Sequence, residues 1–316
     1  MLPDLYVNLE ERASRRWHLP PEHVVYARAL THAYIQDFGG EATAGLVAES
    51  FASTLTEDEH AEAASLAAQI GLPVPFLLFG TLYYDAIKAA LACTAFAVPT
   101  PDGPLHARNL DWWTEGGLLT TGSVITHFTR GGRTHFSTVG WPGFFGALSG
   151  VAPGRFSVTL NAVSSADPPL LARPVVLLLR QVLDEVETYD EAVRILASVP
   201  IAADCLLLVT GVRNEEMTVI ERSPTRSAVR GPERGILAVA NDYLALTNAE
   251  KVERPDGLHV TSSGRYACAL QHLANHVPRN ADACFQVLQA PDVRMGITVQ
   301  HMVLQASTGQ VQLRLP

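Results

Sequence analysis

Lysine is nearly absent from this sequence of 316 residues, and the absence bears on possible partners. Only Lys88 and Lys251 occur, and the positive charge comes mostly from arginines scattered singly along the chain. The net charge is −9. A nucleic-acid-binding protein usually shows a basic patch or stripe, so we expect no nucleic-acid partner.

Long apolar runs are also missing. No stretch reaches the roughly 18 uninterrupted apolar residues that a membrane-spanning helix needs, so we expect no span. The first residues, MLPDLYVNLEERASRRW, lack the apolar centre of a signal peptide. These two absences predict an unexported, cytoplasmic protein.

The four cysteines show no C-x-x-C spacing, which argues against a redox motif or a zinc site built on such pairs. Thiols in a cytoplasmic chain are expected to be reduced. Cys268, His272 and His276 repeat at helical spacing and offer one alternative, three metal ligands on one helix face. Zinc sites usually draw ligands from more than one element, so we favour an ordinary helix and expect neither metal nor cofactor.

The order of helical and strand-like segments predicts the fold class. Hydrophobic residues make up 47% of the chain and charged residues 17%, enough for a sizeable core. The first ninety residues look helical, and we expect an apolar helix that leads straight into Cys93. Strand-like segments then come in groups separated by pairs of helices, which favours antiparallel sheets over strict β–α alternation. We therefore predict an α+β protein in which two antiparallel sheets carry helices on both outer faces.

Cys93 lies where the helical pattern gives way to strands. The segment CTAFAVPTPDGPLHARNLDW reads as two strands around a Pro-Asp-Gly turn. Such a hairpin brings Cys93 beside Arg108 and Asp111, and an arginine next to a thiol favours the thiolate. His106 offers a competing Cys–His pair; we interpret it instead as a packed strand residue.

The same segment resembles the nucleophile region of acid ceramidase and N-acylethanolamine acid amidase, in the choloylglycine-hydrolase group of N-terminal-nucleophile hydrolases. Arg108, Asn109, Leu110 and Asp111 match the family motif, and Ala107 replaces its glycine. Weaker matches follow in order over nearly the whole chain: YVNLEERASRRW, WPGFFGALSGVAPGRFSVTLNAV, SVPIAADCLLLVTG, LAVANDYLA and SSGRYACALQHL. The resemblance implies a four-layer αββα sandwich with a helical N-terminal segment.

The resemblance also implies residue roles. Cys93 corresponds to the nucleophile, Asn241 to the oxyanion-hole asparagine and Arg265 to an arginine near the site. Ala162 stands where the family amidases carry glutamate, and its backbone N–H corresponds to a second oxyanion donor. This departure bears on self-cleavage and on head-group preference.

The implied reaction begins with self-cleavage before Cys93. Residues 1–92 become a helical α chain that stays docked, and residues 93–316 become the catalytic β chain. The freed α-amino group of Cys93 acts as general base, Asp111 holds that group, and Arg108 favours the thiolate.

The substrate expected from the resemblance is a small-molecule acyl amide with a lipophilic acyl group. Large apolar residues flank the motifs and are candidates to line an acyl groove: Trp112, Trp113, Trp141, Phe144 and Phe145. Two alternatives stay open. One is an acyltransferase of the isopenicillin N type, and the other is a non-catalytic scaffold that binds acyl lipids.

Overall fold

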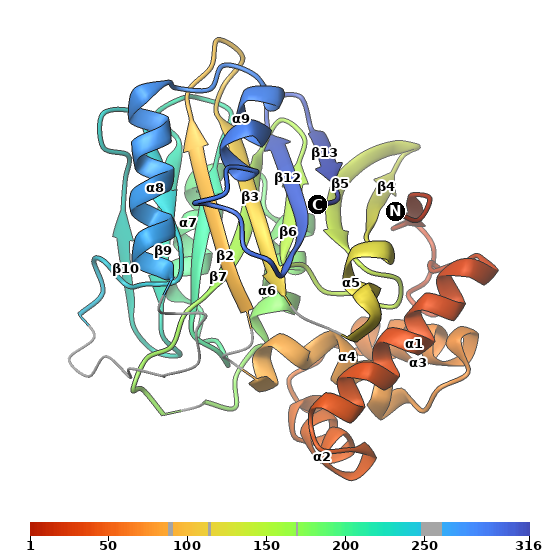
Figure 1. Ribbon diagram of the computed structural model, residues 1–316. Helices are drawn as coiled ribbons and strands as arrows, with labels where there is room; N and C mark the ends of the chain where they lie inside the picture. Colours follow the sequence, from red (N-terminus) through yellow and green to blue (C-terminus); the bar gives the residue numbers. More distant parts are fainter. Residues whose placement is uncertain (88–90, 113–114, 169, 248–260) are drawn as a thin grey trace.

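The computed structural model describes residues 1–87, 91–112, 115–168, 170–247 and 261–316. Trp113, one of the expected groove residues, lies outside this part of the chain. The described elements form two central sheets with helices against both outer faces (Figure 1). This arrangement confirms the predicted α+β class and the αββα layers.

The first sheet has eight strands in the order β1-β4-β5-β6-β7-β8-β9-β10. Its neighbours are antiparallel except for the edge pair β1–β4, which is parallel. The strand bounds are β1 Leu5–Asn8, β4 Val124–Arg130, β5 Arg133–Gly140, β6 Ser149–Ala152, β7 Phe156–Ala162, β8 Cys205–Thr210, β9 Met217–Arg222 and β10 Ser227–Arg230.

The second sheet has five strands in the order β11-β2-β3-β12-β13, all antiparallel. The strand bounds are β2 Leu91–Val98, β3 Leu105–Trp112, β11 Leu237–Val239, β12 Thr298–Gln305 and β13 Gln310–Arg314. Strand β2 packs across the inter-sheet space on β7 and β8, so Cys93 lies in the middle of the molecule.

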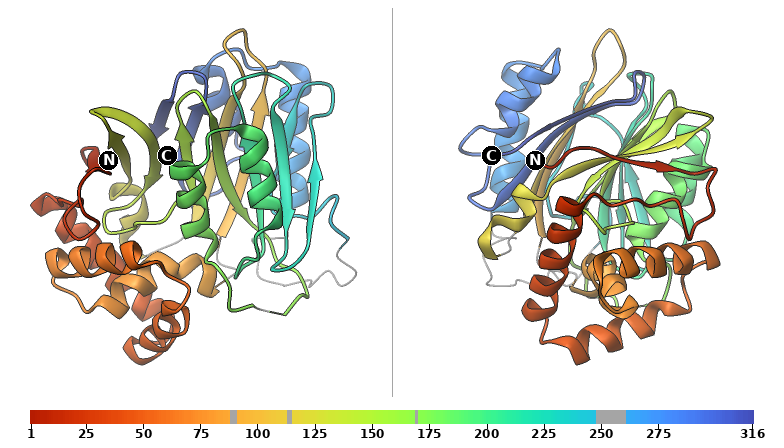
Figure 2. Two further views of the ribbon diagram at one scale, coloured as in Figure 1. Left: turned by 180° about the vertical axis from the view of Figure 1, so that it is seen from behind. Right: turned by 90° about the vertical axis from the view of Figure 1, so that its right-hand side faces the viewer.

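Two pairs of helices form the outer layers. The first pair, α6 (Val175–Glu185) and α7 (Tyr189–Ser198), packs on the eight-stranded sheet. The second pair, α8 (Ser262–Asn275) and α9 (Ala281–Leu288), packs on the five-stranded sheet. The edge-on view on the right of Figure 2 separates these layers.

The N-terminal helices gather at one end of the sandwich (Figure 1). They are α1 Pro21–Asp37, α2 Glu41–Ala52, α3 Glu57–Ile70 and α4 Val74–Ile87. Helix α3 begins with a reciprocal capping box between Thr56 and Glu59, and Gly71 ends the helix with a φ of 73°. Among the described residues no single helix is long and apolar enough to cross a bilayer; α3 and α4 meet that criterion only as a pair bent by 113°.

Several expected boundaries were wrong. The first segment is not purely helical, because Leu5–Asn8 forms an edge strand of the first sheet. The run LLTTGSVITHFTR predicts a strand, but residues 118–121 form the short helix α5 (Leu118–Thr121) after a 3-10 turn (Glu115–Gly117). The run FFGALSG also predicts a strand, but Phe144 and Phe145 precede strand β6 and are not part of it. A short apolar run does not by itself distinguish a strand from a packed turn or a short helix.

Cys93 is also not the first residue of its strand. Strand β2 begins at Leu91 and pairs with β3 from there, with Ala92 opposite Asp111 and Cys93 opposite Leu110. In the intact chain the Ala92–Cys93 peptide bond is therefore part of a regular antiparallel ladder.

Candidate active site

Strand pairing places Cys93 and Arg108 on the same face of the five-stranded sheet. The register sets Cys93 opposite Leu110 and Ala95 opposite Arg108, and side chains two residues apart share a face. The Arg108 Nη2 atom lies 3.2 Å from Cys93 Sγ. Both side chains are fully buried between the sheets.

Strand β7 and the neighbouring strand β6 hold the Arg108 guanidinium. Its Nη2 also donates to the Leu160 carbonyl, and its Nη1 donates to Ser149 Oγ at 2.6 Å. The Cys93 thiol is 3.8 Å from the same Leu160 carbonyl. The eight-stranded sheet thus positions the arginine that faces the thiol.

Asp111 lies on the opposite face of β3, three residues after Arg108. The two do not form an ion pair with each other; the ion-pair partner of Asp111 is Arg265, whose Nη1 is 4.0 Å from Asp111 Oδ2. Burial raises the pKa of Asp111 to about 6, against the opposing effects of a hydrogen bond from Thr298 and of the charges of Arg265 and Arg108. The carboxyl is therefore poised near neutral pH.

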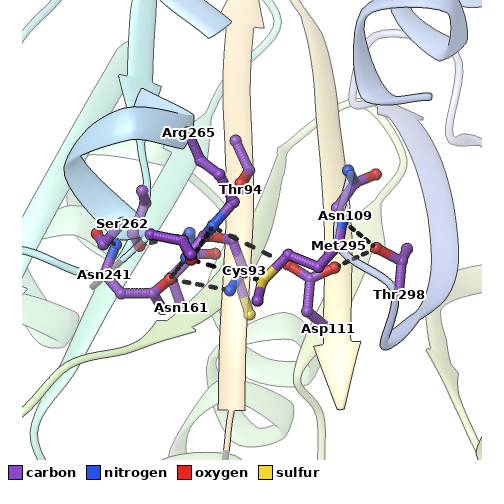
Figure 3. A network of polar contacts seen from close by, with 12 residues as sticks. Cys93, Thr94, Asn109, Asp111, Asn161, Asn241, Ser262, Arg265, Met295 and Thr298 are labelled. Carbon is purple, nitrogen blue, oxygen red and sulfur yellow. Dashed lines mark hydrogen bonds and ion pairs between the residues drawn. The ribbon is translucent and has the colours of Figure 1, made fainter. Parts of the chain in front are cut away.

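Arg265, on helix α8, connects Asp111 to Cys93. Its Nη1 donates to the Cys93 carbonyl at 2.6 Å and to Thr94 Oγ1 at 2.7 Å, and its Nη2 donates to Asn241 Oδ1 at 2.7 Å. Figure 3 shows the arginine spanning from the Cys93–Thr94 backbone to the asparagine. One guanidinium therefore fixes the position of both.

Asn241 lies just after β11 and accepts the backbone N–H of Cys93 at 3.1 Å. Its Nδ2 donates to the Ala162 carbonyl at 2.7 Å, and its own N–H donates to Ser262 Oγ at 2.9 Å. Asn161 Nδ2 donates to the Ala240 carbonyl at 2.9 Å, which holds the residue before Asn241. Asn241 is thus fixed from β7 and from α8.

The Ala162 carbonyl accepts a hydrogen bond from the Asn241 side chain. The Ala162 side chain is fully buried in the main apolar core. A glutamate introduced here would bring a carboxylate into that core, which costs free energy unless the carboxylate is paired.

The Cys–His alternative is not supported. His106 does share the face of Arg108, as the alternation predicts, but its ring nitrogens bond to Ser157 Oγ and Thr159 Oγ1 at 2.9 and 2.8 Å. Burial lowers its pKa to about 3. We therefore interpret His106 as a packed residue of the inter-sheet space.

The metal alternative on α8 is not supported either. His272 bonds to Asp292 at 2.9 Å, and His276 is the C-terminal cap residue of the helix. No three His, Cys, Asp or Glu residues in the described segments come together as metal ligands.

Only some of the expected groove residues line a pocket in the described part of the chain. Trp112, Trp141 and Phe144 line an apolar pocket together with Tyr34 and Tyr83 of the N-terminal helices. Phe145 is buried but does not line this pocket. The cavity volume is about 20 Å³, near the space of one water molecule. In this intact state the pocket is too small for an acyl chain.

Sequence reasoning missed the residues that support this site: Thr94, Ser149, Asn161, Ser262 and Thr298. Each is a small polar residue that is buried in the structure. A buried polar residue needs a partner, but the sequence does not say which one.

Comparison with known proteins agrees with this geometry. Residues 98–294 match the family described as acyl-coenzyme A:6-aminopenicillanic acid acyl-transferase. The N-acylethanolamine-hydrolyzing acid amidase of Caenorhabditis elegans is 28% identical over 94% of this chain and 87% of its own length. The acid ceramidase of Balaenoptera acutorostrata scammoni is 24% identical over 99% of this chain and 86% of its own.

Comparison with a solved structure also confirms the predicted fold. The structure of the Caenorhabditis elegans N-acylethanolamine-hydrolyzing acid amidase ortholog superposes with a TM-score of 0.58 and 25% identity, over 68% of this chain and 93% of that chain. The resemblance to the acid ceramidases and acylethanolamine amidases is confirmed, and the chain belongs to the acyl-coenzyme A:6-aminopenicillanic acid acyl-transferase family.

Proposed function

We propose that this chain is a self-processing cysteine amidase, which cuts itself between Ala92 and Cys93 and then hydrolyses a linear acyl amide through a thioester on Cys93. One observation carries the proposal. The Cys93 thiol faces the Arg108 guanidinium at 3.2 Å, while the nitrogen of the same residue is held by Asn241 at 3.1 Å. Nucleophile and future base are thus both positioned before cleavage.

Self-cleavage follows from this arrangement as an acyl shift. The Cys93 sulfur adds to the Ala92 carbonyl carbon, the C–N bond breaks, and the nitrogen leaves as the α-amine while the acyl group stays on sulfur. Water then hydrolyses the thioester, which frees the Ala92 carboxylate and the thiol. Domains 1–92 and 93–316 are the two products.

Turnover repeats the same chemistry on an external amide. The α-amino group of Cys93, with a reference pKa of about 7.7–8.0, takes the thiol proton and passes it to the leaving amine. The Asn241 amide has a second Nδ2 hydrogen beside the one that Ala162 accepts, and this hydrogen is available to an oxyanion. The Ala162 N–H is the proposed second donor.

The full burial of Cys93 supports cleavage as a condition for activity. The thiol has no exposed surface in the intact chain, so an external substrate cannot reach it. The aromatic pocket beside Trp112 is formed from both proposed fragments, and we propose that it opens for the acyl group after cleavage.

Contacts between the proposed fragments support their continued association. All four cysteines lie at position 93 or later, so no disulfide can join residues 1–92 to the rest of this chain. Strand β1 completes the eight-stranded sheet from the N-terminal side. Glu59 and Glu62 of α3 pair with Arg173 and Arg180 of the larger fragment.

Intact mass and N-terminal sequencing test the cleavage, and hydrolysis of a fatty acyl ethanolamide and of a ceramide tests the turnover, because the relatives are named for those substrates. We expect a larger fragment that begins Cys-Thr-Ala-Phe. Cys93→Ala should abolish cleavage and turnover, whereas Cys268→Ala, a half-exposed cysteine on α8, is the matched control. An active protein that remains one intact chain contradicts the proposal.

Acyl transfer is the second candidate, because the matched family is described as an acyl-transferase. The same thioester would then be attacked by an amine in place of water. Product analysis with added 6-aminopenicillanic acid distinguishes the two: a new amide indicates transfer, and free acid alone indicates hydrolysis.

A cytoplasmic location stays part of the proposal. Its support is that all four cysteines are free thiols in the structure, as expected in a reducing compartment. Cell fractionation with an antibody against the chain tests it.

A further inference from the structure

Thr298 is the first residue of β12, and its hydroxyl contacts the carboxyl group of Asp111. Thr298 Oγ1 lies 2.5 Å from Asp111 Oδ1 (Figure 3). Both residues are buried, with exposed fractions of 4% and 0%. The hydroxyl is therefore close enough for a strong hydrogen bond that water does not weaken.

The Thr298 hydroxyl donates to Asp111, and its oxygen accepts a second hydrogen bond. The backbone N–H of Met295 donates to Thr298 Oγ1 at 3.1 Å, and the Thr298 N–H donates back to the Met295 carbonyl at 3.1 Å. Because the hydroxyl oxygen accepts from Met295, its own hydrogen is free to point to Asp111. Thr298 thus donates to the carboxylate form.

A β-bulge places the hydroxyl there. Thr298 pairs with Asp111 and Gln300 pairs with Leu110, so Val299 is the extra residue on β12. The Trp112 N–H donates to the Ile297 carbonyl at 3.0 Å and fixes the strand end next to the bulge. Bulges occur beside active sites because they redirect a side chain.

The second carboxyl oxygen of Asp111, Oδ2, has a different environment. Asp111 Oδ2 has no hydrogen-bond partner within the described part of the chain, and its ion-pair partner Arg265 is 4.0 Å away. Thr298 occupies Oδ1 and leaves Oδ2 as the oxygen that can take a new donor. The proposed self-cleavage creates a new donor on the neighbouring strand, the α-ammonium of Cys93, one residue after the Ala92 that pairs with Asp111.

We propose that Thr298 is a positioning residue, which holds Asp111 ionised and oriented so that its free oxygen receives the α-amino group of Cys93. The proposal rests on the proposed self-cleaving amidase for the identity of that group. The charged and titratable groups around Asp111 are Arg265 from α8, Arg108 from β3 and Cys93 from β2. Both arginines also favour the carboxylate, so the Thr298 contribution must be isolated by mutation.

The test compares Thr298→Val, which removes the hydroxyl at similar volume, with Thr298→Ser, which keeps it. Thr134→Val, on an exposed position of β5, is the matched control. The first measurement is the pKa of Asp111 in the Cys93→Ala background. It is obtained by a pH titration in which carbon-13 NMR detects the Asp111 carboxyl carbon. We expect Thr298→Val to raise the pKa by about one unit, as loss of a hydrogen bond of about 1.4 kcal/mol to the carboxylate predicts, and Thr298→Ser to restore it.

The second measurement is the pH profile of turnover in the cleaved protein. The acid limb should move to higher pH by the same amount in Thr298→Val and not in Thr298→Ser or Thr134→Val. If Thr298→Val fails to fold by circular dichroism, Thr298→Ala takes its place. An unchanged Asp111 pKa in the hydroxyl-free variant overturns the proposal. An inactive wild type would instead contradict the proposed function, and the NMR titration would still decide the role of Thr298.

Discussion

The backbone N–H of Cys93 donates to the side-chain oxygen of Asn241 over 3.1 Å, although 148 residues separate the two in the sequence. Arg265 donates to the same oxygen. Two donors identify this atom as the amide oxygen and leave Nδ2 facing Ala162. Asn241 therefore holds the nitrogen of the proposed scissile bond, in addition to the oxyanion role that the family resemblance implies.

Asn241→Ala is expected to slow both steps. In cleaved protein, turnover should fall by roughly 10²–10³, about 2.7–4 kcal/mol of transition-state stabilisation, with little change in KM. Cleavage should also slow, because the Cys93 nitrogen loses its acceptor. Asn275→Ala, exposed at the end of α8, should change neither rate, and equal turnover in the two cleaved variants would show that Asn241 is not an oxyanion donor.

The second prediction concerns Glu62 of α3, whose carboxylate joins the two proposed fragments through Arg180. Its side chain is 1% exposed and pairs with Arg180 and Arg16. Breaking a buried ion pair from one side costs about 3–5 kcal/mol. We expect Glu62→Gln to lower the urea midpoint and to release the smaller fragment from cleaved protein on gel filtration.

Asp58→Asn is the matched control for Glu62. Asp58 lies on the same helix and pairs with Arg16, but its side chain is 72% exposed, so the cost should be at most about 1 kcal/mol. Cohesion of the fragments in both variants at low urea would show that strand β1 and the apolar contacts suffice.

The third prediction concerns Glu221 of β9. Its fully buried carboxylate accepts the backbone N–H groups of Leu244, Ala245 and Leu246 at 2.8–3.0 Å, and Arg230 Nε at 3.0 Å. These bonds hold the loop that follows Asn241. Hydrogen bonds to a charged group contribute about 1.5–3 kcal/mol each, so Glu221→Gln should increase hydrogen exchange in residues 242–247 and reduce turnover.

The control for Glu221 is Glu233→Gln, an exposed glutamate in the turn between β10 and β11. It should leave loop exchange and turnover unchanged. Unaltered exchange of residues 242–247 in Glu221→Gln would refute the role of the carboxylate.

Titration of the buried Asp85 carboxyl should make the free energy of unfolding depend on pH. Its Oδ1 accepts the Val175 N–H at 2.7 Å at the start of α6, and burial raises its pKa to about 7, against several opposing hydrogen bonds. The folded state therefore binds the proton more tightly than the unfolded state. The free energy of unfolding should fall as pH rises from about 4 to about 7 and then level off.

Asp85→Asn keeps a carbonyl oxygen for Val175 and removes the titration. Urea unfolding of the uncleaved Cys93→Ala protein between pH 4 and 8 should show a shallower fall in the Asp85→Asn variant. Parallel curves for the two proteins would assign the pH dependence to another group.

The local part of the site was predictable from the sequence. A Pro-Asp-Gly turn between two apolar runs predicts a hairpin, and the hairpin brings Cys93 beside Arg108 because strands of a hairpin pair in register. The capping box of α3 and the helices α6 and α7 were predictable for the same reason, since short-range spacing and hydrogen bonding determine them.

The tertiary structure alone decided which distant residues complete the site and which face of the strand each occupies. Asp111, three residues from Arg108, turns away from the thiol towards Arg265, and Thr298 reaches it only through a bulge at the start of β12. Thr298 and Asp111 are 187 residues apart. The physical reason is that a buried hydroxyl or carboxyl needs a partner of matching hydrogen-bond capacity, and the sequence contains the need while sheet register and helix packing determine the partner.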